Sequence, residues 1–324
     1  MDAKAHGETG DTTRPHRAGA LDRLRSVVLL AGGVRETKLS SILPSSLLDL
    51  PLESNLTVLD QLMQQTDDLA THLGRESLDV RLLIGRLSKD FAVSPEASRS
   101  NVCVERDPFD YRGTGGVLRD IGTKYEEDDL VLVGNGSQVF VDPLRELAES
   151  LAADGGDVGV VAHRDGTPSG LMLVRCGCLK AIPASGFIDM KEQALPLIAQ
   201  HHRVMVTMRD RPSTLPIRTL TDYLYALRLH HLRAKDQTAL DDPFREDFEP
   251  TFGVVQEGAD VDPSARVHDS VVLRGAKVAA GAILVRSLVS SGATVRRDQR
   301  IVDRLVGSPA MARRRQKNVE AADE

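Results

Sequence analysis

A repeat with a period of six residues runs through the C-terminal part of the chain and restricts its fold more than any other feature. Apolar residues recur at Val255, Val261, Val267 and Leu273, and again at Ile283, Val289, Val295 and Ile301. Small residues, mostly glycine and alanine, lie between them. This pattern is typical of a parallel β-helix with three short strands per coil, in which each coil buries aliphatic side chains against the next. The ten-residue step from Leu273 to Ile283 predicts a bulged corner.

Strand-like and helix-like segments alternate in the part of the chain before this repeat. Strands are predicted at 27–31, 80–85, 130–133 and 158–162, and helices at 58–65, 143–153 and 220–232. The alternation predicts an α/β fold with a mostly parallel sheet that is covered by helices on both faces. Ligands of such sheets bind at the carboxyl ends of the strands. Gly32 and Asn135 both follow predicted strands, so we expect them to face one crevice.

Shifts in composition divide the chain into five parts. Polar tails are predicted at 1–22 and 309–324, an α/β domain at 23–238, a proline-containing linker at 239–253 and the β-helix at 254–308. We expect Asp142 to cap the helix that begins at Pro143, because aspartate is a favoured N-cap residue and proline is favoured in the first turn.

The overall composition excludes several classes of partner. Hydrophobic residues make up 41% of the chain and charged residues 27%, as in ordinary globular proteins. A net charge of −6 and an aromatic content of 3% argue against nucleic acid as a partner. No apolar run approaches the roughly 20 residues of a membrane helix, and the first residues lack an apolar signal segment. We therefore expect a cytoplasmic protein without a membrane partner.

The sequence offers no convincing metal site. Cys176 and Cys178 are one residue apart, but no second Cys or His pair with ligand spacing lies nearby, so we interpret them as small buried thiols. His201 and His202 lie near a predicted helix end, where a role at the surface or with the helix dipole is more typical than metal ligation. No residue is therefore predicted to bind a metal.

The apolar run Val27–Leu30 ends in Ala31 and then in two glycines. Such a run predicts a buried strand that leads into a tight turn. Glycines at this place let backbone N–H groups approach a phosphate. They also serve simply to turn the chain, and the residues alone do not separate these two roles.

Four segments resemble the sugar-1-phosphate nucleotidyltransferases, also called NDP-sugar pyrophosphorylases. Leu30-Ala31-Gly32-Gly33 with Thr37-Lys38-Leu39 is similar to the family's opening loop, and residues 113–119 resemble the loop that holds the nucleotide base. Asn135-Gly136 resembles the start of the family's Asn-Gly-Asp, and residues 186–196 resemble a helix of the mannose-1-phosphate guanylyltransferase branch. The resemblance spans about residues 26–308, because many members also carry a left-handed β-helix.

The resemblance implies a Rossmann-like nucleotidyltransferase domain and a set of nucleotide-binding residues. Those residues are Leu30, Ala31, Gly32, Gly33, Gly113, Thr114, Gly115, Gly116, Asn135 and Gly136. Lys38 is the catalytic candidate, since it stands where the family places a cation near the phosphates; an exposed lysine without a role is the alternative.

The catalytic positions of the family are mostly replaced in this chain. Members transfer a nucleotidyl group to a sugar-1-phosphate with release of pyrophosphate, and two carboxylates hold Mg²⁺ for that reaction. Here Ser137 and Pro216 stand at the two carboxylate positions, and Ser45 replaces a lysine that faces phosphate. Loss of one group that stabilises a transition state costs about 10² to 10³ in rate.

Three hypotheses of function follow. The first is a catalytically impaired protein that binds a nucleoside triphosphate or nucleotide-sugar and serves as a regulatory subunit in nucleotide-sugar or polysaccharide metabolism. The second is an active, divergent sugar-1-phosphate nucleotidyltransferase that uses Mg²⁺. The third is a structural protein that oligomerises through its β-helix. A homo-oligomer, or a hetero-oligomer with an active nucleotidyltransferase, is compatible with these hypotheses.

Overall fold

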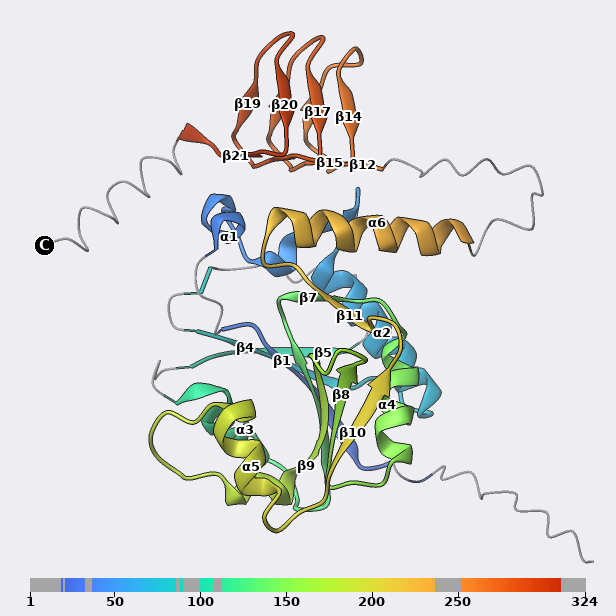
Figure 1. Cartoon of the computed structure of the whole chain (residues 1–324), viewed down its shortest axis with the longest axis vertical. Coiled ribbons are helices and arrows are strands. Elements are labelled where there is room, and N and C mark those ends of the chain that lie inside the picture. Colours follow the sequence, from blue (N-terminus) through green and yellow to red (C-terminus); the bar gives the residue numbers. More distant parts are fainter. Residues whose placement is uncertain are drawn as a thin grey trace, which may run out of the picture.

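The structure, a computed structural model, describes residue 19 and residues 21–32, 37–85, 88–89, 100–107, 112–236 and 252–309, with the backbone alone for 234–236. An α/β part comes first, and a region of short parallel strands follows it (Figure 1). The predicted tails and linker lie almost wholly outside the described residues.

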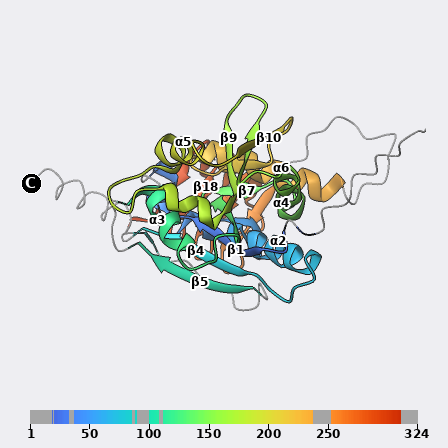
Figure 2. The same ribbon diagram turned by 90° about the horizontal axis from the view of Figure 1, so that it is seen from below.

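Seven strands form the central sheet in the order β10-β8-β9-β6-β1-β4-β5. Their bounds are β1 (Leu24–Leu30), β4 (Asp79–Ile84), β5 (Asn101–Arg106), β6 (Leu130–Asn135), β8 (Val158–His163), β9 (Pro168–Arg175) and β10 (Val204–Arg209). Only β9 runs antiparallel to its neighbours, so the predicted mostly parallel sheet is confirmed. The edge strands β5 and β10, at opposite sides in Figure 2, were not predicted; apolar residues such as Val104, Val206 and Met208 occupy their exposed positions, so the sequence lacks the polar–apolar alternation of a half-exposed strand.

Helices cover both faces of this sheet. Their bounds are α1 (Lys38–Ile42), α2 (Val58–His72), α3 (Gly113–Gly122), α4 (Leu144–Ala153), α5 (Leu195–Ile198) and α6 (Leu220–Asp236), with short turns η1 (Leu47–Asp49), η2 (Cys176–Ala181) and η3 (Met190–Ala194). Val27 and Leu29 belong to the core under α2 and α4, whereas Val28 belongs to the core under α3 and η2 (Figure 1). Alternate residues of β1 are thus buried on opposite faces. None of the described helices has the length and apolarity that a membrane span requires.

Two small ribbons complete the α/β part. One pairs β2 (Pro51–Glu53) with β3 (Leu56–Thr57), and the other pairs β7 (Gln138–Phe140) with β11 (Thr214–Pro216). The predicted cap at Asp142 is wrong: α4 has no side-chain cap, and the Asp142 carboxylate lies 3.2 Å from Arg233. Gln65, from α2, instead accepts a hydrogen bond of 3.0 Å from the N–H of Leu144.

Ten short strands build the region after residue 252, which we call the repeat region (residues 253–306). They are β12 (Gly253–Val255), β13 (Asp260–Val261), β14 (Arg266–His268), β15 (Ser270–Val272), β16 (Lys277–Val278), β17 (Ile283–Val285), β18 (Leu288–Val289), β19 (Thr294–Val295), β20 (Arg300–Val302) and β21 (Leu305–Val306). Every partner in three parallel sheets lies 17 residues further along the chain, as in the pairing of Val254 with Val271.

The inward positions of the repeat region correct the predicted register. Val267, Val272 and Val278 pack in its core, so one side of each coil is five residues long and the others are six. Leu273 instead packs outward in the core of the α/β part, and the predicted ten-residue step with a bulged corner is wrong. The arrangement is compatible with a parallel β-helix, and left-handedness stays a prediction.

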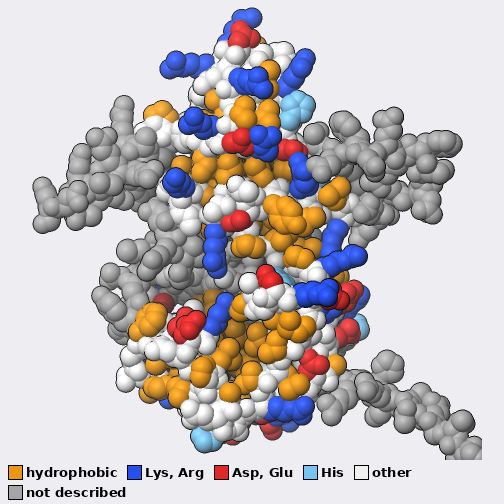
Figure 3. All heavy atoms as spheres, in the orientation of Figure 1, with side chains coloured by type: hydrophobic (Ala, Val, Ile, Leu, Met, Phe, Trp, Pro, Cys, Tyr) orange, Lys and Arg blue, Asp and Glu red, His pale blue; other side chains and the backbone are white. Residues whose placement is uncertain are grey.

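The repeat region and the α/β part share one hydrophobic core. On the sheet β12-β15-β18-β21, Val272 faces inward, while Val271 and Leu288 face outward into the cluster that contains Leu39 of α1 and Leu227 of α6. Figure 3 shows apolar side chains continuing across this junction on the visible face. α1, which follows the predicted phosphate loop, is therefore held between the two parts.

Candidate functional site

The carboxyl ends of β1, β4 and β6 meet at one edge of the sheet. Leu30 pairs with Leu83 on one side and with Asn135 on the other, so the segments that follow these strands are neighbours. The N–H of Ala31 donates to Leu83 O at 2.8 Å, and the N–H of Gly136 donates to Leu30 O at 3.0 Å. The predicted residues Leu30, Ala31, Gly32, Asn135 and Gly136 are thus brought together, while Gly33 lies outside the described residues.

Gly32 is required by the packing of two strand ends. A Cβ atom built there would lie 2.2 Å from the backbone nitrogen of Gly85, and one built on Gly85 would lie 2.7 Å from Gly32 O. At Gly136 an added Cβ would lie 2.8 Å from the Cβ of Ala31. Gly85 is not part of any motif that the sequence indicated, and it follows β4 as Gly32 follows β1. Close backbone approach explains these glycines without a ligand.

The glycines at the start of α3 pack against a second predicted motif. Gly113 has a φ of +66°, and an added Cβ would lie 2.4 Å from Ile188 O. The N–H of Gly115 donates to that same oxygen at 2.9 Å, and the N–H of Ile188 donates to Arg112 O at 3.0 Å. The segment 112–115 and Ile188 therefore form a small backbone ladder, which no local sequence signal indicated.

Thr114 joins the same two motifs through its side chain. Its hydroxyl accepts a hydrogen bond of 2.9 Å from the N–H of Met190 and lies 3.4 Å from an oxygen of Asp189. The other carboxylate oxygen of Asp189 accepts from the N–H groups of Lys191 and Glu192, at 2.8 and 2.9 Å, and so caps η3. Thr114 and Asp189 are thus committed to holding the start of α3 beside η3.

Ser137 and Pro216, which stand at the two carboxylate positions implied by the sequence resemblance, lie on adjoining segments. Gln138 of β7 pairs with Pro216 of β11, and the N–H of Ile217 donates to Ser137 O at 3.0 Å. The Ser137 hydroxyl donates to the Asn135 side-chain oxygen at 2.9 Å, which closes the turn after β6. At the two positions that the sequence resemblance assigns to carboxylates, the chain presents a buried serine and an exposed proline. These residues do not fit a Mg²⁺ site, which takes oxygen ligands with carboxylates among them.

Gln138 adds an unusual group to this edge of the sheet. Its side chain is buried, and its Nε2 atom has no hydrogen-bond partner among the described residues. Its Oε1 atom lies 2.9 Å from the position of a Cβ built on Gly170, whose φ is +82°. A buried amide N–H without a partner is costly, so this donor is available to a ligand or to water.

Lys38 is exposed at the first position of α1. The helix is fixed at its start by a reciprocal cap. The N–H of Ser40 donates to the Thr37 hydroxyl at 3.1 Å, and the N–H of Thr37 donates to the Ser40 hydroxyl at 2.8 Å. At its other end, Lys89 donates to Ser40 O and Leu43 O at 2.6 and 2.8 Å, a role that the sequence did not indicate. Lys38 has no ion pair with another described residue and lies at the end of the predicted phosphate loop.

The segment after Pro216 serves the fold. Thr219 and Asp222 cap the start of α6 reciprocally, with two hydrogen bonds of 3.1 Å. Tyr223 is fully buried and donates its hydroxyl to Pro51 O; burial raises the pKa of this phenol well above its ordinary value. These contacts anchor the strand that carries Pro216 beside the turn at Ser137.

Comparisons with known proteins give a distant structural similarity. No protein-family model and no curated protein sequence matches the chain. The crystal structure of HddC from Yersinia pseudotuberculosis is 17% identical, with a TM-score of 0.47, over 63% of this chain and 98% of that one. Its complex with GMP-PN is 18% identical, with a TM-score of 0.46, over the same shares. A putative glucose-1-phosphate thymidylyltransferase from Bacillus anthracis, in complex with a sucrose, is 12% identical, with a TM-score of 0.49, over 64% of this chain and 95% of that one. Similarity at this level does not transfer a substrate or an activity to this chain.

Proposed function

We propose that this chain binds a nucleotide at the carboxyl edge of its sheet and has little or no nucleotidyltransferase activity. In this proposal it serves as a regulatory or scaffold subunit beside an active nucleotidyltransferase. The observation that carries the proposal is that Ser137 and Pro216 lie on adjoining segments, at the two positions where the resembled family has carboxylates. Neither side chain can do the work of a carboxylate in binding a metal ion.

Two features support a nucleotide site. The ends of β1 and β6 are in register, so the turn at Gly32 lies beside the turn at Gly136. α3 begins soon after β5, whose last residue pairs with the end of β4, so the glycine-rich helix start is close to the same edge. Backbone N–H groups at glycine turns can bind phosphates without side chains, and in this proposal the N–H groups that do so are ones that the fold does not already use, as it uses those of Ala31, Gly115 and Gly136.

The missing carboxylates support loss of turnover. In nucleotidyl transfer, an oxygen of the sugar phosphate bonds to the α-phosphorus as the bond to pyrophosphate breaks, and negative charge must be stabilised on the transferring group. Ser137 and Pro216 supply no charge to hold the cation that would do so. Loss of each such group costs about 10² to 10³ in rate, so the two together leave little activity even without full additivity.

A pyrophosphate-release assay tests the loss of activity. The full chain is incubated with Mg²⁺, each common nucleoside triphosphate and a panel of sugar-1-phosphates. We expect release no faster than in a control without protein. Robust turnover would overturn the proposal and favour an active, divergent nucleotidyltransferase with Mg²⁺ as cofactor.

Thermal unfolding with added nucleotide tests binding. A ligand at 100 times its Kd stabilises the folded state by about 2.7 kcal/mol, so a binding nucleotide raises the Tm measurably. Lys38→Ala is expected to weaken triphosphate binding by about tenfold, or about 1.4 kcal/mol. Lys277→Ala, an exposed lysine in β16, is the matched control and should bind as the wild type does.

The outcomes of this experiment separate the remaining hypotheses. If no nucleotide or nucleotide-sugar raises the Tm, the binding proposal fails and a structural or oligomerisation role is favoured. If binding is present but unchanged in Lys38→Ala, the nucleotide site stands and the role given to Lys38 is wrong.

A further inference from the structure

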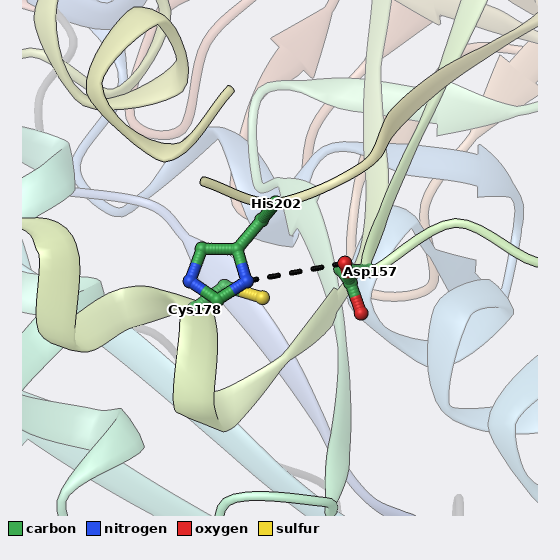
Figure 4. Close-up of side chains that lie close together, drawn as sticks. All are labelled: Asp157, Cys178 and His202. Carbon is green, nitrogen blue, oxygen red and sulfur yellow. Dashed lines mark ion pairs between the residues drawn. The ribbon is translucent and has the colours of Figure 1, made fainter. Parts of the chain in front are cut away.

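Three side chains with metal-binding chemistry meet at the edge of the sheet opposite the glycine turns. Asp157 directly precedes β8, Cys178 lies in η2, and His202 lies between α5 and β10. Figure 4 shows the Cys178 sulfur beneath the His202 ring, with the Asp157 carboxylate beside both. The three residues are far apart in the sequence, so no motif spacing reveals them.

The distances are close to those of a transition-metal site. One ligand atom from each residue lies within 4.8 Å of the other two, and His202 Nδ1 lies 3.9 Å from Asp157 Oδ2. Tetrahedral Zn²⁺ with bonds of about 2.0–2.3 Å holds its ligand atoms about 3.3–3.6 Å apart. Side-chain rotations that bring the ligand atoms closer by up to about 1 Å would therefore complete the site.

The backbone around the cluster is well fixed. The N–H of Asp157 donates to Arg203 O at 2.8 Å, and the N–H of Arg203 donates back to Asp157 Oδ2 at 2.9 Å. This reciprocal pair places His202, the residue before Arg203, beside Asp157. In η2 the N–H groups of Cys176 and Gly177 donate to Asp129 O and Glu127 O, both at 2.8 Å, which holds the turn that carries Cys178. Pre-organised ligands of this kind lower the entropic cost of binding an ion.

The cluster has one buried and one open side. Cys178 is fully buried, whereas the side chains of Asp157 and His202 are 30% and 33% exposed. Solvent therefore reaches the cluster through the exposed parts of Asp157 and His202. Arg175 Nε lies 3.2 Å from Asp157 Oδ1, while Oδ2, which also accepts the hydrogen bond from the N–H of Arg203, is the oxygen that faces His202.

We propose that Asp157, Cys178 and His202 bind one divalent transition-metal cation of the Zn²⁺ class, with a fourth position open to water. Thiolate, imidazole and carboxylate together offer sulfur, nitrogen and oxygen ligands. This mixed set binds Zn²⁺ in preference to Mg²⁺ and Ca²⁺, which take oxygen ligands. The bound ion would connect the start of β8, the turn after β9 and the segment before β10. The site is separate from the proposed nucleotide site, so each can fail without the other.

Zinc titration of the full chain tests this proposal. The protein is stripped with a chelator, and Zn²⁺ is titrated in competition with a chromogenic chelator. We expect one bound ion per chain, and an affinity more than about tenfold lower in Cys178→Ser and in His202→Gln, since even the outer partners of metal ligands account for 10- to 100-fold. Cys176→Ser and His201→Gln are matched controls, each altering a neighbour outside the cluster, and they should bind as the wild type does.

Cobalt substitution tests the thiolate bond directly. Co²⁺ bound by a cysteine thiolate absorbs in the near ultraviolet, and we expect this band in the wild type and in Cys176→Ser but not in Cys178→Ser. His202 is partly exposed, so His202→Gln keeps the test valid if Cys178→Ser does not fold. Substoichiometric zinc binding by the wild type, or an equal loss of affinity in the control variants, would overturn the proposal.

Discussion

Each of the three cysteines has a different environment, and their reactivity should differ accordingly. Cys103 is exposed. Burial, with the nearby Asp129 carboxylate, raises the pKa of Cys176 to about 12, and burial, with Asp157, raises that of Cys178 to about 11. Since the thiolate is the reactive form, we expect an alkylating reagent at pH 8 to label Cys103 alone in the metal-free native protein.

Peptide mass spectrometry checks this prediction, with the unfolded protein, in which all three cysteines react, as the control. Raising the pH from 8 to 9 should leave the two buried thiols unlabelled, because their pKa values are still far above that pH. Native labelling of Cys176 at the rate of Cys103 would contradict the burial described for η2.

Asp129 should make the free energy of unfolding depend on pH in the acid range. Burial alone would raise its pKa, but hydrogen bonds from Arg25 and from the N–H of Glu126, at 2.8 and 3.1 Å, outweigh burial and lower it. A carboxyl group with a lowered folded pKa stabilises the protein above its unfolded pKa of about 3.9, and this contribution is lost as the pH falls through the folded pKa. Asp129→Asn should therefore be less stable at pH 7 and lose less stability on acidification.

Urea unfolding between pH 2 and pH 7 measures both effects. Asp165→Asn is a suitable comparison, since Asp165 also has a lowered pKa, from hydrogen bonds with Thr167, but lies in an exposed turn. A pH dependence in Asp129→Asn identical to that of the wild type would show that this ion pair does not contribute.

At the scale of elements, close approach between segments determines which glycines are irreplaceable. Gly113 and Gly74 have nearly the same φ, +66° and +67°, but an added Cβ meets Ile188 O at 2.4 Å in the first case and nothing within 4 Å in the second. Gly74→Ala should cost about 1–2 kcal/mol for the left-handed backbone. Gly113→Ala should cost about 1–3 kcal/mol more, because Ile188 must move.

Chemical denaturation of the two variants measures this difference in the free energy of unfolding. If both variants lose the same stability, the ladder between the start of α3 and Ile188 is not formed as described. The comparison isolates packing, since backbone strain is nearly equal at the two positions.

At the scale of the whole molecule, the shared core predicts that the α/β part and the repeat region unfold together. Leu288, on β18, is fully buried among residues of both parts. Leu288→Ala should lower the free energy of unfolding by about 2–5 kcal/mol and shift the whole transition. Differential scanning calorimetry should show one transition for the wild type and the variant, with the exposed Lys277→Ala as control. Two separate transitions, of which Leu288→Ala moves one, would contradict this coupling.

Local patterns in the sequence predicted part of the architecture. The strand around Val27 and the burial of Cys176 and Cys178 follow from side chains close together in the chain, and the structure agrees. The repeat after residue 253 predicted short parallel strands, but its predicted register was wrong at Leu273. Edge strands were missed because apolar residues on their exposed faces, such as Val104 and Val206, remove the alternation expected of a half-exposed strand. The Asp142 cap was wrong because a distant residue, Gln65, supplies the hydrogen bond instead.

The sequence by itself determined where four strands of the central sheet lie, β1, β4, β6 and β8, and which glycines follow β1 and β6. Only the tertiary structure decided what the glycines touch: Gly32 against Gly85, and Gly113 against Ile188. It also decided that His202 lies beside Asp157 and Cys178, whose spacing along the chain shows no motif. Contacts of this kind depend on strand order and on how helices pack across the sheet, and these result from the burial of the whole apolar surface rather than from any local run of residues.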